Sequence, residues 1–409
     1  MERRLDEAAV NIASRAPATP AERISTRFAI ASCQYPAGVF DLVPARESID
    51  RLETAVADAT NSAAFKAILF LGDQIYADAT YGILDPAGTL DRFNQAHDAW
   101  WHALETRTHV SQLLQDNKIH VALDDHEICD NWEPCPGHDN EQILQNALAA
   151  FDGKTGFVLH PKRSQQDGYW GQVDIGGGHN AFMLDTRTTR ERRPWGPGNS
   201  SGAAPHILNE AQRDALDTWL KEQRDADDRA GRIRPKFISC AVWPLPRRAG
   251  RHPDPAMMEA AAMRSDGWDG YPASLKWLLG SIARHNIHGV VFLCGDAHLA
   301  GYTQVHLRAG DSRTTLRILH SPALYAPFPF ANGQPHHYRC NDRLEWEEDG
   351  IKHAAHVKSE LWPMGDGFVQ VDVEQAAHGW KIAAHFNTAP SGGRRLHWNT
   401  TDWGVRTNT

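Results

Sequence analysis

The sequence has little cysteine and no long apolar run, and these two absences remove several classes of protein. Its 409 residues include only six cysteines, which are scattered and form no CxxC pair or zinc-ribbon spacing. Neither a disulfide framework nor a cysteine-type structural zinc site is therefore expected. No apolar stretch approaches the roughly 20 residues that span a membrane, and residues 1–20 contain acidic groups and no apolar signal-peptide core. We therefore expect a cytoplasmic protein with no membrane partner.

The chain also lacks an excess of positive charge. With 42 Lys and Arg against 51 Asp and Glu, its net charge is −9, which argues against a nucleic-acid-binding surface. This balance still permits a small cationic pocket for an anionic substrate. Hydrophobic residues make up 41% of the chain, and no repeat, low-complexity block or linker is visible. We predict one domain over residues 27–390, with a lead-in at 1–26 and a tail at 391–409, and no pattern sets the oligomeric state.

Helical and strand patterns alternate along the chain, which is typical of an α/β fold. Apolar spacing predicts helices over residues 48–59, 91–115 (one or two), 141–151, 209–225 and 272–286, and a hairpin over 169–174 and 180–185. Asn209 is the expected N-cap of the 209–225 helix, with Gln212 as its capping-box partner. Residues 314–320, 367–373 and 380–387 alternate between apolar and polar, so we expect antiparallel strands that complete a second sheet.

Four short apolar runs each end in residues that bind metals or phosphates. The clearest spans residues 68–78, where Ile68-Leu69-Phe70-Leu71 runs into Gly72, and Asp73, Tyr76 and Asp78 follow. The other three span residues 119–127, 182–187 and 290–298, and they end in Asp124-Asp125-His126-Glu127, Asp185-Thr186-Arg187 and Gly295-Asp296-Ala297-His298. Ligands bind at the carboxyl ends of strands in open α/β sheets. We therefore expect these side chains to form one site.

The side chains at these ends suit two metal ions better than one. The candidate ligands are Cys33, Asp73, Tyr76, Asp125, His126, Asn131, Asp296 and His298. Hard oxygens suit calcium, magnesium, manganese or ferric iron, and imidazole and phenolate suit iron or zinc. Two adjacent ions that share Asp73 fit this number of ligands, and paired ions about 3.5–4 Å apart hydrolyse phosphate esters through a metal-bound hydroxide. Arg187 and Arg190 would then hold the phosphate bidentately.

Each residue also has a purely structural interpretation. Cys33 would be a buried core thiol, and Tyr76 an aromatic residue at the rim of the site. His126 would hold Asp125 in place, and Asp185 would cap its turn and orient Arg187. The loops at residues 34–44, 188–205 and 244–270 are placed to select a substrate, but their side chains do not identify it.

Taken together, these motifs resemble the PhoD-like alkaline phosphatases of the calcineurin-like metallophosphoesterase superfamily. The matching segments are Ala31-Ser32-Cys33, Gly72 to Asp78, Asp124 to Glu127 with Asn131, Asp185-Thr186-Arg187, Asp266 to Tyr271, and Gly295 to His298. They occur in the family order over residues 27–300. The resemblance implies a four-layer α/β/β/α sandwich of two mixed sheets flanked by helices, the metallo-dependent phosphatase fold.

The resemblance also implies roles for individual residues. Cys33, Asp73, Tyr76 and His298 would bind a ferric ion. Asp73 would bridge to a calcium ion, or to manganese, magnesium or zinc, held also by Asn131, Asp266 and Asp296. The choice between Asn131 and Asp125 as ligand stays open. His126, with Asp125 and Arg187, would take part in hydrolysis of a small phosphate mono- or diester, with His126 as general acid or as an outer partner.

Two other functions compete with this hypothesis. A non-haem iron oxidoreductase would use two histidines and one carboxylate on one iron, but the many carboxylates and the arginine-rich loop argue against it. A catalytically inactive relative would bind metal or phosphate without turnover. Intact candidate ligands argue against that, and a turnover assay distinguishes it.

Overall fold

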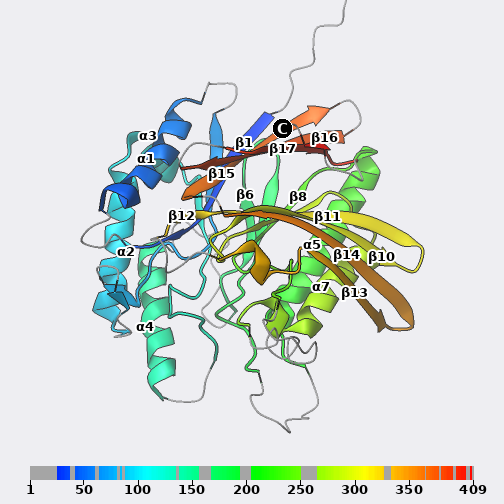
Figure 1. Cartoon of the computed structure of the whole chain (residues 1–409), viewed down its shortest axis with the longest axis horizontal. Helices are drawn as coiled ribbons and strands as arrows, with labels where there is room; N and C mark the ends of the chain where they lie inside the picture. The colour runs from blue at the N-terminus through cyan, green and yellow to red at the C-terminus, as the bar shows by residue number, and fades with distance from the viewer. Residues whose placement is uncertain are drawn as a thin grey trace, which may run out of the picture.

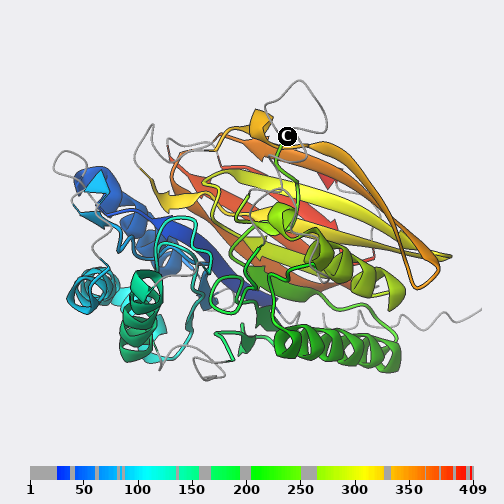
Figure 2. The same ribbon diagram turned by 90° about the horizontal axis from the view of Figure 1, so that it is seen from below.

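Two mixed β-sheets pack face to face in the computed structural model, with helices on their outer faces (Figures 1 and 2). The structure describes residues 25–36, 42–59, 64–80, 83–84, 88–134, 138–155, 167–193, 204–249, 265–326, 333–363, 365–376, 379–389, 393–401 and 406–407. The predicted substrate-selecting loops at 34–44, 188–205 and 244–270 lie partly outside these residues.

The first sheet is built around β1 (Ser25–Gln34), which pairs in parallel with β2 (Phe65–Phe70). Next to β2 lies β5 (Ile119–Val121), also parallel, and β12 (Ala323–Tyr325) pairs with the end of β1. The other side continues with antiparallel strands: β15 (Gly367–Ala376), β16 (Gly379–Thr388), β17 (Arg395–Asn399) and β18 (Arg406–Thr407). Residues 391–409, the predicted tail, thus contribute two strands to this sheet.

The second sheet has a parallel centre and antiparallel flanks. Its strands are, in order, β13 (Asn341–Glu348), β14 (Ile351–Trp362), β10 (Ala300–Ala309), β11 (Ser312–His320), β9 (Val290–Cys294), β8 (Lys236–Cys240), β7 (Asn180–Met183) and β6 (Gly171–Asp174). The predicted hairpin is confirmed as β6 and β7. The prediction that residues 367–373 and 380–387 complete this sheet is wrong: they form β15 and β16, and β15 pairs with β1 of the first sheet.

Helices cover the outer face of each sheet and complete four layers. On the first sheet lie α1 (Leu42–Ala57), α2 (Leu90–Glu105), α3 (Thr108–Gln115) and α4 (His138–Thr155), and on the second lie α5 (Glu210–Ala230) and α7 (Pro272–Arg284). Between the sheets, Phe28 and Leu69 pack in one buried cluster with Leu293. The predicted α/β/β/α sandwich is therefore present. None of the helices that the structure describes combines the length and apolar character that crossing a bilayer requires.

Short elements complete the described chain. They are the two-stranded ribbon of β3 (Ala79–Thr80) and β4 (Ile83–Leu84), and the 3₁₀ helices η2 (Trp268–Gly270) and η3 (Pro335–His337). Asn209 caps α5 as predicted, since its side chain accepts a hydrogen bond from the Gln212 amide at 2.8 Å. The Gln212 side chain instead bonds both backbone groups of Asp185, at 2.9 and 3.0 Å. The predicted capping box is therefore replaced by a contact that fixes the end of β7.

The end of β9 approaches β1 so closely that only glycine fits at position 295. A Cβ on Gly295 would lie 2.5 Å from the Cβ of Ser32. We expect Gly295→Ala to lower the free energy of unfolding by about 1–3 kcal/mol, the usual cost of overpacking. Gly153→Ala is the control, because a Cβ there meets nothing within 4 Å and alanine favours the helix by up to about 1 kcal/mol. Urea denaturation measures both changes, and equal effects of the two substitutions would contradict this steric account.

Candidate metal centre

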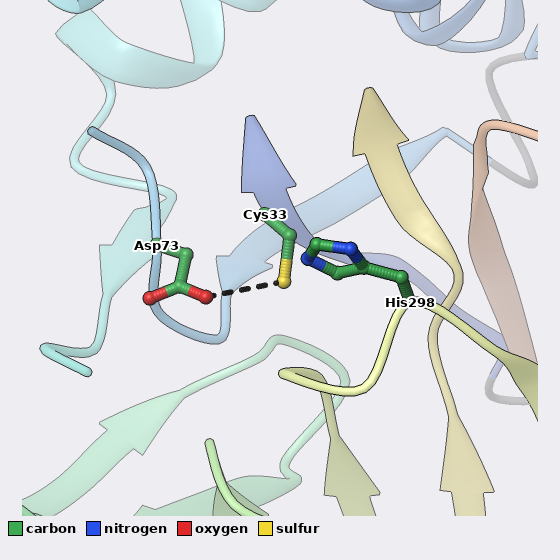
Figure 3. A group of neighbouring side chains, drawn as sticks. All are labelled: Cys33, Asp73 and His298. Carbon is green, nitrogen blue, oxygen red and sulfur yellow. Dashed lines mark hydrogen bonds between the residues drawn. The ribbon is translucent and has the colours of Figure 1, made fainter. Parts of the chain in front are cut away.

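The ends of β1, β2 and β9 bring one thiol, one carboxylate and one imidazole together (Figure 3). The Cys33 Sγ lies 3.4 Å from Asp73 Oδ2, and a ligand atom of His298 is within 4.8 Å of both. Tyr76 joins this group, because its hydroxyl lies 3.1 Å from the His298 Nε2. The four residues expected to bind a ferric ion therefore lie side by side, although they span residues 33 to 298 of the chain.

A second group of ligand atoms shares Asp73 with the first. The carboxylates of Asp73, Asp124, Asp125 and Asp296 approach one another within 4.8 Å, and Asp73, Asp125 and His126 form a third such group. Asp73 is the residue that all three groups share. Asp124 was not among the predicted ligands, although it directly precedes Asp125 at the end of the same apolar run.

Asn131 and Asp266 lie next to this carboxylate group. The exposed Asn131 donates its backbone N–H to Asp125 Oδ2 at 2.6 Å. The buried Asp266 directs its Oδ2 to Arg187 Nη1 at 2.7 Å. Asp125 is thus the member of the third segment whose carboxylate faces Asp73, and the role of Asn131 as a ligand stays a prediction.

Unusual backbone angles mark the same residues. Among the described residues, eight other than glycine have a positive φ. Three of them, Asn117, Asn286 and Asp349, lie in turns after α3, after α7 and between β13 and β14. The other five are predicted metal ligands: Cys33, Asp73, Asn131, Asp296 and His298, at 59°, 56°, 54°, 66° and 54°. Non-glycine residues rarely adopt this conformation, and it gathers at functional sites where the surrounding structure enforces it.

Glu127 holds the loop that carries Asp73. Its buried carboxylate accepts backbone N–H bonds from Asp73 at 3.0 Å, Ile75 at 3.2 Å and Asp124 at 2.7 Å. One side chain therefore fixes the turns after both β2 and β5. The sequence pattern assigned Glu127 no role, since acceptance of distant backbone groups leaves no local signal.

His126 is oriented by Asp78 at the edge of the site. Its Nδ1 lies 2.9 and 3.1 Å from the two Asp78 oxygens, and its ring packs on Tyr76 with centroids 4.0 Å apart. Burial favours the neutral imidazole, but the nearby carboxylates, chiefly Asp125, outweigh it and raise the pKa of His126 well above its usual value. In the metal-free protein these carboxylates therefore favour the protonated imidazole.

The two arginines predicted to bind phosphate are buried among protein groups. Arg187 is inaccessible to solvent and pairs with Asp124 through Nε, with Asp266 through Nη1 at 2.7 Å and with Asp125 through Nη2 at 3.3 Å. Arg190 donates to the backbone oxygens of Thr186 and Asp266 at 2.7 and 2.8 Å. Both guanidinium groups thus brace the site, and their action as substrate clamps stays a prediction.

If all were ionised, the carboxylates of the site would carry more negative charge than Arg187 balances. Burial and the neighbouring acids raise the pKa of Asp73 well above its usual value. Burial raises the pKa of Asp124 to about 8 and that of Asp296 to about 7, in spite of Arg187. Within the part of the chain that the structure describes, the buried Asp124 Oδ2 has no hydrogen-bond partner. Bound cations would offset the repulsion between these carboxylates, so the residues present fit metal ions.

The raised pKa values of these acids predict how the stability of the metal-free protein depends on pH. Asp124 and Asp296 have pKa values of about 8 and 7 in the folded protein, against 3.8 in an unfolded chain. At pH values between the folded and unfolded pKa, the folded state therefore binds more protons than the unfolded state. Stability then falls as pH rises from about 5 to about 8. Urea denaturation at both pH values tests this. Bound metals should flatten the dependence, whereas a metal-free protein that is more stable at pH 8 would contradict the account.

Comparison with known proteins identifies the family of this chain and its fold. A family model described as PhoD-like phosphatase matches residues 28–323, which include every predicted site residue. A solved structure described as "Structure of PhoD" shares the fold, with a TM-score of 0.62 and 16% identity over 96% of this chain and 73% of that chain. The search of curated proteins finds no significant match. Because the family model spans well over half of the sequence, the chain belongs to the PhoD-like phosphatase family.

Proposed function

We propose that this protein hydrolyses phosphate mono- or diesters in a metal-dependent reaction at a centre of two cations. Membership of the PhoD-like phosphatase family supports a phosphoesterase. The observation that carries the two-cation proposal is the position of Asp73, which belongs at once to a thiol–imidazole group and to a carboxylate group. A shared carboxylate between two different ligand sets is what a bridged pair of metal ions requires.

The two ligand sets differ in chemistry, and this supports two different ions. Cys33, Tyr76 and His298, with Asp73, would hold a ferric ion, since thiolate, phenolate and imidazole suit iron. Asp73, Asp296 and Asp125 or Asn131, with Asp266 close by, would hold calcium, or manganese, magnesium or zinc in its place. When bound, such ions neutralise phosphoryl oxygens and lower the pKa of water.

The chain's own residues supply the remaining requirements. His126 is oriented by Asp78 at the edge of the site, so a proton on its ring would be placed to reach the leaving oxygen of the ester. Arg187 holds Asp124, Asp125 and Asp266 in one arrangement. Glu127 fixes the loop of Asp73. No serine or threonine occupies the shared position, so we expect no covalent phosphoenzyme.

A turnover assay with and without metals tests this proposal. The purified protein should hydrolyse an aryl phosphate monoester, an aryl phosphate diester or both. It should lose that activity on chelation and regain it when iron and calcium are supplied. Absence of turnover in the metal-loaded protein would favour the inactive relative. Activity that requires oxygen and an organic co-substrate would instead favour the oxidoreductase.

A further inference from the structure

We propose that Arg248 binds the phosphoryl group of the substrate and makes phosphate monoesters preferred over diesters. This inference rests on the proposed phosphoesterase activity and goes beyond it, because it assigns a substrate-binding residue and a substrate class. It begins from the observation that the arginines expected to bind phosphate already have partners within the protein. Arg187 and Arg190, the two arginines that the sequence predicts to hold phosphate, are buried against acids and backbone oxygens.

Arg248 lies on a segment that runs beside the loop of Asp296 and His298. This segment covers residues 243–249. Trp243, at its start, donates its indole N–H to the Gly295 oxygen, and the centroid of its ring lies 4.9 Å from that of the Tyr338 ring. Arg248 pairs with Tyr338 in an isolated antiparallel bridge. The stretch that leads to Tyr338 is itself held to the metal-centre loop, since Gly333 N donates to Ala297 O at 3.3 Å.

The backbone of Arg248 is fixed on both sides. Its N–H donates to Asp269 Oδ2 at 2.6 Å, and the N–H of Ala249 donates to His337 O, also at 2.6 Å. The adjacent Arg247 forms a two-point ion pair with Asp342, at 2.7 and 3.0 Å. Because successive side chains of an extended segment point to opposite sides, Arg248 points away from Asp342.

The charge of Arg248 interacts electrostatically with Tyr338 and with acids of the metal centre. Its electrostatic partners include Asp296, Asp266 and Asp269. The residue is exposed, and among the described residues its guanidinium has no hydrogen bond or ion pair. A guanidinium at the edge of a metal centre with donors free for a ligand suits phosphate, whose oxygens it binds two at a time.

The number of phosphate oxygens sets the expected substrate class. A monoester has three terminal oxygens and two negative charges, whereas a diester has two such oxygens and one charge. If two cations each engage one oxygen, a third remains for Arg248 only in a monoester. The additional positive charge also attracts a dianion more strongly than a monoanion.

The test compares Arg248→Gln with Arg343→Gln, which removes an exposed arginine paired with Glu345 on β13. Three measurements are made: kcat/KM for an aryl phosphate monoester and a diester, the Kd of inorganic phosphate by calorimetry, and metal content. Arg248→Gln should lower kcat/KM for the monoester, and the affinity for phosphate, by about 10- to 100-fold, the usual effect of losing a charge-assisted hydrogen bond. The diester should change by less than about threefold, and metal content should be unchanged.

Other outcomes overturn the inference in distinguishable ways. An equal loss for both esters would show that Arg248 does not make the monoester preferred. An unchanged phosphate Kd, or a loss of metal from Arg248→Gln, would show that Arg248 does not act by binding the phosphoryl group. If the wild-type protein hydrolyses neither ester, the proposed function fails. The effect of Arg248→Gln on the phosphate Kd then still decides whether this residue binds a phosphoryl group.

Discussion

Asp73→Asn is expected to lower kcat/KM for an aryl phosphate by more than about 10³-fold, because losing one preorganised electrostatic group typically costs about 10²–10³-fold and Asp73 serves both ligand sets. Asparagine tolerates the positive φ of 56° at this position. The backbone should therefore be retained while the bridging charge is lost. Steady-state kinetics measure the rate, and elemental analysis should show that both metals are lost.

Asp349→Asn is the matched control for this substitution. Asp349 is also an aspartate with positive φ, 52°, but it lies exposed in the turn between β13 and β14. Its replacement should leave rate and metal content unchanged. An Asp73→Asn variant with wild-type kcat/KM and a full metal complement would show that Asp73 bridges nothing.

Arg187→Gln is expected to lower the free energy of unfolding by about 3–5 kcal/mol, the cost of removing one partner from a buried ion pair. Arg187 is buried completely and faces three carboxylates. Without it, Asp124, Asp125 and Asp266 would remain buried with no arginine between them. Urea denaturation of the metal-free variant and wild type gives the difference.

The control for this substitution is Arg224→Gln, which removes an exposed arginine paired with Asp225 at 2.7 Å, a type of contact worth about 0–1 kcal/mol. The comparison also decides between two roles for Arg187. A variant of unchanged stability whose KM for phosphate esters rises about 10- to 100-fold would support the substrate clamp predicted from sequence, and would contradict the bracing role.

The strand ends of the site could be predicted from sequence because their signals are local. Apolar runs that end in Gly72-Asp73 and Gly295-Asp296 specify buried strands with polar exits, and glycine is required where strands approach closely. The contacts of Glu127 and Arg187 could not be found in this way. Their partners lie on other segments, and only the fold brings them together.

The sequence pattern also could not predict which strands lie next to each other in the sheets. Alternation in residues 367–373 and 380–387 identifies half-buried antiparallel strands, but it does not specify which sheet they join. In the structure Phe28 pairs with Val371, and the apolar faces of both enter the core between the sheets. Gln212 shows the same limit, since its sequence position suits a capping box while its side chain bonds Asp185.

Metal content per chain in the wild type and in three variants tests the central claim most directly. The wild-type protein should contain two ions. Cys33→Ala should lose the ion of the thiol–imidazole group, Asp296→Asn the ion of the carboxylate group, and Asp73→Asn both. If all three variants keep the wild-type complement, or if the wild type hydrolyses phosphate esters with no metal bound, the two-cation account is wrong.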